Sequence, residues 1–182
     1  AQESRGLGDV YKRQVRGRID ETAQMALRLD AAMAEVSLPN GQRSDDFARA
    51  ERSAWEETGE AYRPTLLADV PLIPAHTALL ATTVYHGTNP PGIVELVPSE
   101  SPRPAGWGAA LVIVDGLIAQ AVDDGICQRF SHVPGMQELL LRAVSYRRHI
   151  NDLHPTSRSN TRSHIERVEQ HLVSQASAIL ER

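Results

Sequence analysis

The stretch "ALVIVDGLIAQAV", residues 110–122, decides between two folds for this chain. It consists of two apolar runs on either side of Asp115 and Gly116. Asp-Gly between apolar runs is a strong signal for a β-hairpin, because a type I′ turn needs positive φ at both central residues. A buried helix shows the same continuous hydrophobicity, and periodicity does not separate the two. We expect the hairpin, with a helix as the alternative.

The preceding segment also has β character. "TALLATTVY" (residues 77–85) and "IVELV" (residues 93–97) are rich in threonine and β-branched residues. Between them lies "HGTNPPG", whose prolines and glycine make a continuous helix unfavourable. Together with residues 110–122, these runs predict a small, mostly antiparallel sheet of about four strands within residues 77–122.

Helical patterns flank this region on both sides. Apolar residues recur at steps of three and four from Ile19 onward and again in residues 44–58, which predicts two N-terminal helices. The same spacing recurs after Pro134 and in residues 160–181, which predicts two C-terminal helices. The expected fold class is therefore α+β, with an all-α fold as the alternative.

The segment "SRGLGDVYKRQ" (residues 4–14) contains the chain's only lysine, Lys12. Reverse-translated, it resembles the adaptor and transposon end used to prepare DNA libraries. We therefore expect residues 1–14 to be non-native and disordered. Residues 15–182 would then be a single domain, translated from a metagenomic fragment and truncated at its N-terminus.

Composition narrows the function classes. A net charge of −4 argues against a dedicated, sequence-independent nucleic-acid binder, which needs a net basic face. The single Cys127 cannot form an internal disulfide, which is compatible with a reducing cytoplasm. No apolar run reaches the roughly 18 to 20 residues of a membrane span. We expect a cytoplasmic protein without a membrane partner.

Few residues suggest chemistry. His86, in "YHGT" (residues 85–88), lies where a strand is expected to end, and such a histidine can orient a phosphate or a ribose. Glu138 lies at the start of a predicted helix. These two are the catalytic candidates. The sequence does not decide whether the chain is an enzyme, and no spacing predicts a metal site or a cofactor.

Three arginines of the helix that follows Pro134 form a second candidate group. Arg142, Arg147 and Arg148 could contact nucleic acid or another anion. Glu138 and Arg142 are four residues apart, the spacing of an ordinary helix-surface ion pair. Part of this charge is therefore ordinary helix-surface pairing, and nucleic acid is kept as a candidate partner.

Residues 83–150 resemble the front half of a ribonuclease H domain: a strand ending in "VYHGT", then "GWGAALVI", a return strand, and a helix opening "MQELLLRAV". The resemblance implies metal-dependent phosphodiester cleavage, with Glu138 as the helix carboxylate. His86 stands where the family has its first aspartate, and a strand-borne aspartate after the helix is missing. The resemblance therefore implies a degenerate nuclease.

Residues 110–124, "ALVIVDGLIAQAVDD", are also similar to the late dimer-forming helix of tetracycline-repressor-like regulators. In that family Asp-Gly-Leu lies inside a helix, and the DNA-binding helices are at the N-terminus. This resemblance implies a ligand-binding and dimerisation domain that lacks its DNA-binding part. It assigns helix to the segment in which the ribonuclease H resemblance needs strands.

The sequence alone does not determine the function. We favour a cytoplasmic, non-enzymatic binding or assembly module, with self-association through the amphipathic helix 160–181. The degenerate ribonuclease H-like domain and the regulator domain are the alternatives. The secondary structure of residues 110–122 discriminates between these two resemblances.

Overall fold

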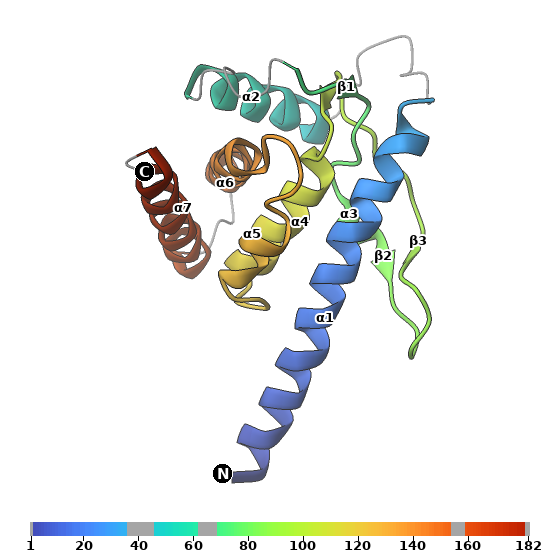
Figure 1. The fold of residues 1–182 in the computed structure, drawn as a ribbon, viewed down its shortest axis with the longest axis vertical. Coiled ribbons are helices and arrows are strands. Elements are labelled where there is room, and N and C mark those ends of the chain that lie inside the picture. The colour runs from blue at the N-terminus through green and yellow to red at the C-terminus, as the bar shows by residue number, and fades with distance from the viewer. Residues whose placement is uncertain (1, 36–45, 62–68, 154–158, 181–182) are drawn as a thin grey trace.

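The computed structural model describes residues 2–35, 46–61, 69–153 and 159–180 (Figure 1). Within these residues the chain forms seven α-helices and four short strands. The helices are α1 (Gln2–Met33), α2 (Asp46–Ala61), α3 (Leu79–Thr82), α4 (Trp107–Ile118), α5 (Gly125–Arg129), α6 (Met136–Leu153) and α7 (Ser159–Leu180). The strands are β1 (Leu72–Ile73), β2 (Thr83–Val84), β3 (Gly92–Ile93) and β4 (Arg103–Pro104).

The strands pair into two antiparallel sheets of two strands each. β1 pairs with β4, and β2 pairs with β3 in a register that places Thr83 opposite Ile93 and Val84 opposite Gly92. The expected α+β class is confirmed, with far less strand than helix. The four strands lie within residues 72–104, so the sheet begins earlier and ends earlier than expected.

Helix α4 lies at the centre of the molecule, with α1 on one side and α6 and α7 on the other (Figure 1). Ten of its twelve residues are buried. A helix that is apolar on all sides is stable only when neighbours cover all of them. This explains why the sequence of α4 shows continuous hydrophobicity instead of an amphipathic stripe.

The hairpin expected in residues 110–122 is wrong, because this segment is helical up to Ile118. Asp115 and Gly116 serve helix packing instead of a turn. The Asp115 carboxylate accepts two hydrogen bonds from Arg147 of α6, each 2.7 Å long. A Cβ on Gly116 would lie 2.8 Å from Cγ2 of Ile19 in α1, so glycine permits the close approach of the two helices.

The helix also bears on the two family resemblances. The ribonuclease H resemblance needs strands where α4 lies, so its structural premise is wrong. The regulator resemblance expects a helix there and a second helix packed on it, and α4 does pack against α6. In the described residues, however, α4 is covered on all sides within one chain, which leaves no face for a dimer contact.

An edge-to-face row of aromatic rings joins three helices. The Trp107 ring of α4 lies 5.0 Å from that of Trp55 in α2 and 5.5 Å from that of Tyr146 in α6. Arg103 places its buried guanidinium over Trp55, 4.0 Å from the ring centroid. These contacts are typical of aromatic and cation–π packing, and they fix α2 and α6 against one end of α4.

The flanking helices are confirmed. α1 buries Ile19, Thr22 and Ala26 of the predicted stripe, and α7 buries Ile165, Val168 and Leu172 of its own. Residues 44 and 45 of the second predicted helix lie outside the described residues, as does residue 181 of the last. The strand expected at residues 77–85 is only partly correct, because α3 occupies its centre and β2 only its end.

The first helix begins at Gln2, so the expected adaptor segment is helical instead of disordered. A helix that is anchored at one end propagates easily, because each added residue gains a hydrogen bond without a new nucleation cost. The described side-chain contacts that anchor α1 begin at Arg18. The foreign origin of residues 4–14 stays a prediction.

Among the described residues, none of the helices combines the length and the apolarity that a membrane crossing requires.

Candidate functional site

The site is built on residues 82–96, which we call the hairpin arm. β2 and β3 form its two sides, and residues 85–91 connect them at the tip. Gly87 adopts φ +55°, a conformation that L-residues rarely adopt, and the N–H of Asn89 donates a 3.0 Å hydrogen bond to the His86 carbonyl. The "YHGT" stretch is therefore a turn at the tip of the arm.

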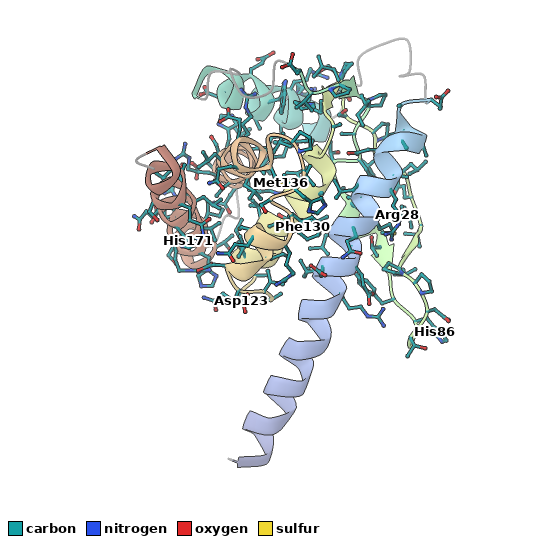
Figure 2. All side chains as sticks on the ribbon, viewed as in Figure 1. Arg28, His86, Asp123, Phe130, Met136 and His171 are labelled. Atoms are coloured by element: carbon teal, nitrogen blue, oxygen red, sulfur yellow. The ribbon has the colours of Figure 1, made fainter. Side chains whose placement is uncertain are left out.

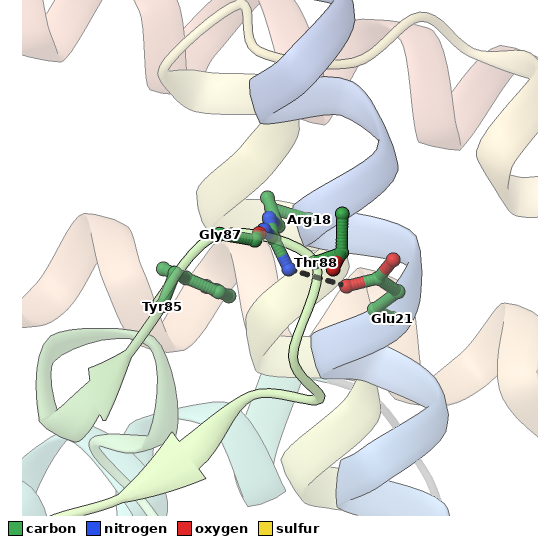
Figure 3. A pocket seen from close by; sticks show the side chains of 5 residues that line it. All are labelled: Arg18, Glu21, Tyr85, Gly87 and Thr88. Atoms are coloured by element: carbon green, nitrogen blue, oxygen red, sulfur yellow. Dashed lines mark hydrogen bonds and ion pairs between the residues drawn. The ribbon is translucent and has the colours of Figure 1, made fainter.

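Arg18 of α1 docks the tip of the arm (Figure 3). Its guanidinium donates hydrogen bonds to the carbonyls of Gly87 and Asn89, the second over 3.3 Å. It also forms a 3.1 Å ion pair with Glu21, and it lies 5.2 Å from the centroid of the Tyr85 ring. One side chain thus satisfies the turn carbonyls and joins them to a carboxylate of α1.

A second polar contact lies beside the first. The Thr22 hydroxyl donates a 2.7 Å hydrogen bond to the Arg18 carbonyl and lies 2.5 Å from the Tyr85 hydroxyl. Because a hydroxyl carries one proton, Tyr85 is the donor in that pair. Thr22 is fully buried, so this contact satisfies a polar group that would otherwise destabilise the junction.

An open cleft of about 580 Å³ lies at this junction, lined by Arg18, Glu21, Tyr85, Gly87 and Thr88 (Figure 3). Two groups at this cleft, the Arg18 guanidinium and the Tyr85 hydroxyl, already form hydrogen bonds with other groups of the protein. The chemical role of these groups is therefore to hold the arm against α1.

His76 fastens the base of the arm from inside. Its Nε2 lies 2.9 Å from the Glu95 carbonyl and its Nδ1 accepts a 3.3 Å hydrogen bond from the Ala78 N–H, so the neutral ring carries its proton on Nε2. Burial lowers the pKa of His76, and the hydrogen bond to the Glu95 carbonyl and the charge of Glu95 oppose that shift in part. The ring therefore stays neutral at pH 7.

The arm exposes a cluster of apolar side chains. Val94 is 67 % exposed, Leu96 54 % and Val84 52 %. Of the large hydrophobic residues that the structure describes as exposed, only three lie elsewhere: Leu72, Leu153 and Val173. Apolar groups that gather on one element indicate a contact surface, whereas single, scattered apolar groups do not.

The backbone at the outer edge of β3 also faces away from the molecule. The Val94 N–H donates a 3.0 Å hydrogen bond to the Thr82 carbonyl on the inner side. Hydrogen-bonding direction alternates along an antiparallel strand, so the N–H and C=O of Ile93 point outward. An exposed edge of this kind is a template for pairing with another strand.

The two catalytic candidates lie apart. His86 lies at the tip of the arm, far from the start of α6, which Met136 marks in Figure 2. Glu138 is buried in α6 and accepts a 2.9 Å hydrogen bond from Arg142. In the described residues, therefore, nothing brings these two side chains into one site.

The three arginines of α6 each have a carboxylate partner. Arg142 pairs with Glu138, Arg147 with Asp115, and Arg148 with Glu169 of α7 at 2.7 Å. Such pairing neutralises the charge that nucleic acid would need. An anion contact by these residues stays a prediction that the geometry does not favour.

The apolar stripe of α7, expected as a surface for self-association, packs inside the chain. Ile165, Val168 and Leu172 are at most 2 % exposed, and α7 packs against α6 and α4. Beside this stripe, Val173 of α7 remains 44 % exposed. Self-association through α7 would therefore have to use the exposed side that carries Val173.

No model of a protein family, no curated protein and no solved structure matches this chain. Among the described residues, no group of three or more His, Cys, Asp or Glu side chains is arranged to hold a metal ion.

The arm could be predicted from the sequence in part. The two β-rich runs, residues 77–85 and 93–97, and the turn residues between them predict two strands of a mostly antiparallel sheet. Arg18 and Thr22 could not be singled out, because an arginine and a threonine near the start of an amphipathic helix are common. Their role depends on a contact with a segment about seventy residues away in the sequence.

Proposed function

We propose that this chain is a cytoplasmic, non-enzymatic assembly module, and that two copies join through the outer edge of β3. One observation carries the proposal: in the part of the chain that the structure describes, the N–H and C=O of Ile93 have no backbone partner, and they lie at an edge that is flanked by the exposed side chains of Val84 and Val94. Native proteins usually cover or blunt such an edge. A second copy of the chain would cover it.

The backbone favours one register for this pairing. A two-fold axis at Ile93 lets the Ile93 residues of the two copies exchange N–H···O=C bonds. The same register places Glu95 opposite Pro91 of the second copy. Pro91 has no N–H, and the Glu95 carbonyl accepts a bond from the buried His76 on the inner side of the arm, so this position adds no hydrogen bond to the pairing.

The side chains support the same register. It places Val94 of one copy opposite Gly92 of the second copy. Within the second copy, Gly92 is opposite Val84, so Val94 of the first copy lies in one row with that Val84. A Cβ on Gly92 would lie 3.5 Å from Cγ2 of Val84, so the missing side chain leaves room beside Val84. Val94 of one copy would fill this room on the other and remove both valines from water.

The pairing also improves the sheet itself. A two-stranded hairpin is only marginally stable, whereas three or more strands with an apolar face are stable. Two arms joined at β3 would make a four-stranded antiparallel sheet. Arg18 and His76 hold each arm in place beforehand, which lowers the entropy cost of association.

Two observations support the remaining parts of the proposal. The catalytic candidates His86 and Glu138 lie apart, and Glu138 is held by Arg142, which fits a role that is not catalytic. The single Cys127 is buried, and burial, with the Asp124 charge, raises the pKa of its thiol to about 11. An inert, unpaired thiol is compatible with a reducing compartment.

The regulator domain is the second candidate, and the helical state of α4 favours it. Such a domain would dimerise through a pair of helices instead of a strand edge, and because α4 is covered within one chain, that pair would have to come from other helices. The two candidates therefore predict different interfaces, and the same experiment separates them.

The experiment is sedimentation equilibrium of the unaltered chain and two variants, between about 10 and 300 µM, because small interfaces are weak. Val94→Asp places a charge in the proposed interface. Val173→Asp places the same charge at an exposed valine of α7 and is the matched control. We expect dimers for the unaltered chain and Val173→Asp, and monomers for Val94→Asp.

The other outcomes contradict the proposal. A monomeric unaltered chain at the highest concentration would exclude assembly through β3. Dimers that persist in Val94→Asp would favour the helix-pair interface of a regulator domain. Dissociation by Val173→Asp alone would place the interface on α7.

A further inference from the structure

A second cleft, of about 540 Å³, lies between α1 and the end of α5 with the residues that follow it. Figure 2 labels one residue on each wall, Arg28 on α1 and Phe130 just after α5. The volume lies in the range of small-molecule sites in proteins. The hairpin arm does not contribute to this cleft.

The cleft is locally positive in a chain whose net charge is −4. Its carboxylate, Asp20, is already used, because Arg129 Nε donates to one oxygen at 3.0 Å and Gln24 to the other at 3.3 Å. Arg28 makes no ion pair with any residue that the structure describes. The guanidinium of Arg28 and the Nη atoms of Arg129 are thus available to an anion.

His132 adds a ring nitrogen to the cleft, which is an acceptor in the neutral ring. Its Nδ1 lies 3.0 Å from the Arg129 carbonyl, and a carbonyl only accepts, so Nδ1 carries the proton. Nε2 then remains as the second polar atom of the ring, without a partner among the described residues. The ring stacks on Phe130 with centroids 6.2 Å apart, so its orientation is fixed.

The floor of the cleft is apolar. Phe130 is 2 % exposed, and Leu27 is half-buried against the core. Ligand sites of proteins combine an apolar lining with a few polar groups that orient the ligand. We propose that this cleft binds a small organic anion, whose carboxylate or phosphate lies at Arg28 and Arg129 and whose apolar body lies against Leu27 and Phe130.

The test is calorimetric titration of the full chain with phenyl phosphate and with benzoate. Inorganic phosphate supplies the anion alone, and benzyl alcohol supplies the apolar group alone. The two organic anions distinguish a phosphate head group from a carboxylate. We expect at least one of them to bind, and inorganic phosphate and benzyl alcohol to bind at least tenfold more weakly.

Two matched variants locate the binding. Arg28→Gln removes an exposed charge of the cleft, and Arg162→Gln removes an exposed charge of α7. Loss of a charged hydrogen bond predicts a dissociation constant about tenfold or more higher for Arg28→Gln, and less than twofold higher for Arg162→Gln. Thermal unfolding followed by circular dichroism checks that both variants fold.

Three results would overturn the inference. The first is that neither organic anion binds the unaltered chain. The second is that Arg162→Gln weakens binding as much as Arg28→Gln does. The third is that inorganic phosphate binds as tightly as phenyl phosphate. The Val94→Asp variant, which tests assembly, should bind the organic anion as the unaltered chain does. Failure of the cleft and failure of the assembly proposal are therefore distinguishable.

Discussion

Arg147 and Asp115 form a two-bond ion pair that joins α6 to the C-terminal third of α4, with Nε to Oδ1 and Nη2 to Oδ2 both at 2.7 Å. Both side chains are about three-quarters removed from water. Paired Arg–carboxylate bonds of this kind fix geometry as well as charge. They hold a polar residue inside a helix that is otherwise apolar.

We expect Asp115→Asn to destabilise the chain by about 1–3 kcal/mol, because it leaves the largely buried Arg147 charge without its partner. Urea denaturation measures the free energy of unfolding. Asp152→Asn is the control, since Asp152 pairs with Arg162 in an exposed position and should lose less than about 0.5 kcal/mol. Equal losses in both variants would contradict a special role for the Asp115–Arg147 pair.

Gly116→Ala tests whether α1 and α4 need their close approach. The new Cβ would lie 2.8 Å from Ile19 and 3.1 Å from Val122, so we expect a loss of about 1–3 kcal/mol in spite of the better helix propensity of alanine. Gly108→Ala, in the same helix, meets only ordinary contacts and should be neutral or stabilising. Chemical denaturation of both variants gives the comparison, and a stabilised Gly116→Ala would refute the packing argument.

The raised pKa of Asp30 predicts how the stability of the chain depends on pH. Burial raises the pKa of Asp30 to about 6, although the 2.6 Å hydrogen bond from the Gly106 N–H opposes the shift. The folded state therefore binds a proton more tightly than the unfolded state. Stability should fall as the pH rises from about 4 to about 6, and this contribution should then stay constant.

Asp30→Asn should remove this part of the pH dependence and should be more stable than the unaltered chain at pH 7, by about 1–3 kcal/mol. Thermal unfolding at several pH values between 4 and 8 measures both effects. Asp152→Asn should leave the slope unchanged. A slope that persists in Asp30→Asn would assign the pH dependence to other groups.

The sequence predicts those elements whose pattern is local. The stripes of α1 and α7 and the turn at residues 86–92 follow from spacing and from proline and glycine chemistry, and the structure has them in place. α4 could not be predicted, because its neighbours cover all its sides and erase the helical period. Asp115 and Gly116 have the chemistry of a turn, and only their contacts with Arg147 and Ile19 show why they lie in a helix.

The candidate site, like the fold, could be predicted from the sequence only in part. His86 and the rest of the turn could be singled out, but their role depends on Arg18 of α1. The arginines of α6 had an identifiable charge pattern, yet the carboxylates that pair with Arg147 and Arg148 come from other helices. Long-range pairing of this kind leaves no trace in one sequence.

The most direct test of assembly through β3 is disulfide cross-linking between two variants, Gly92→Cys and Val94→Cys. In the proposed register these positions form a non-hydrogen-bonded pair, in which Cα atoms lie about 4.5 Å apart, a distance that a disulfide can span. The unaltered chain, whose only cysteine is the buried Cys127, is the control. We predict that an oxidised equimolar mixture of the two variants gives a covalent dimer that contains one chain of each. Absence of that mixed dimer, or equal cross-linking by either variant alone, would contradict the proposed interface.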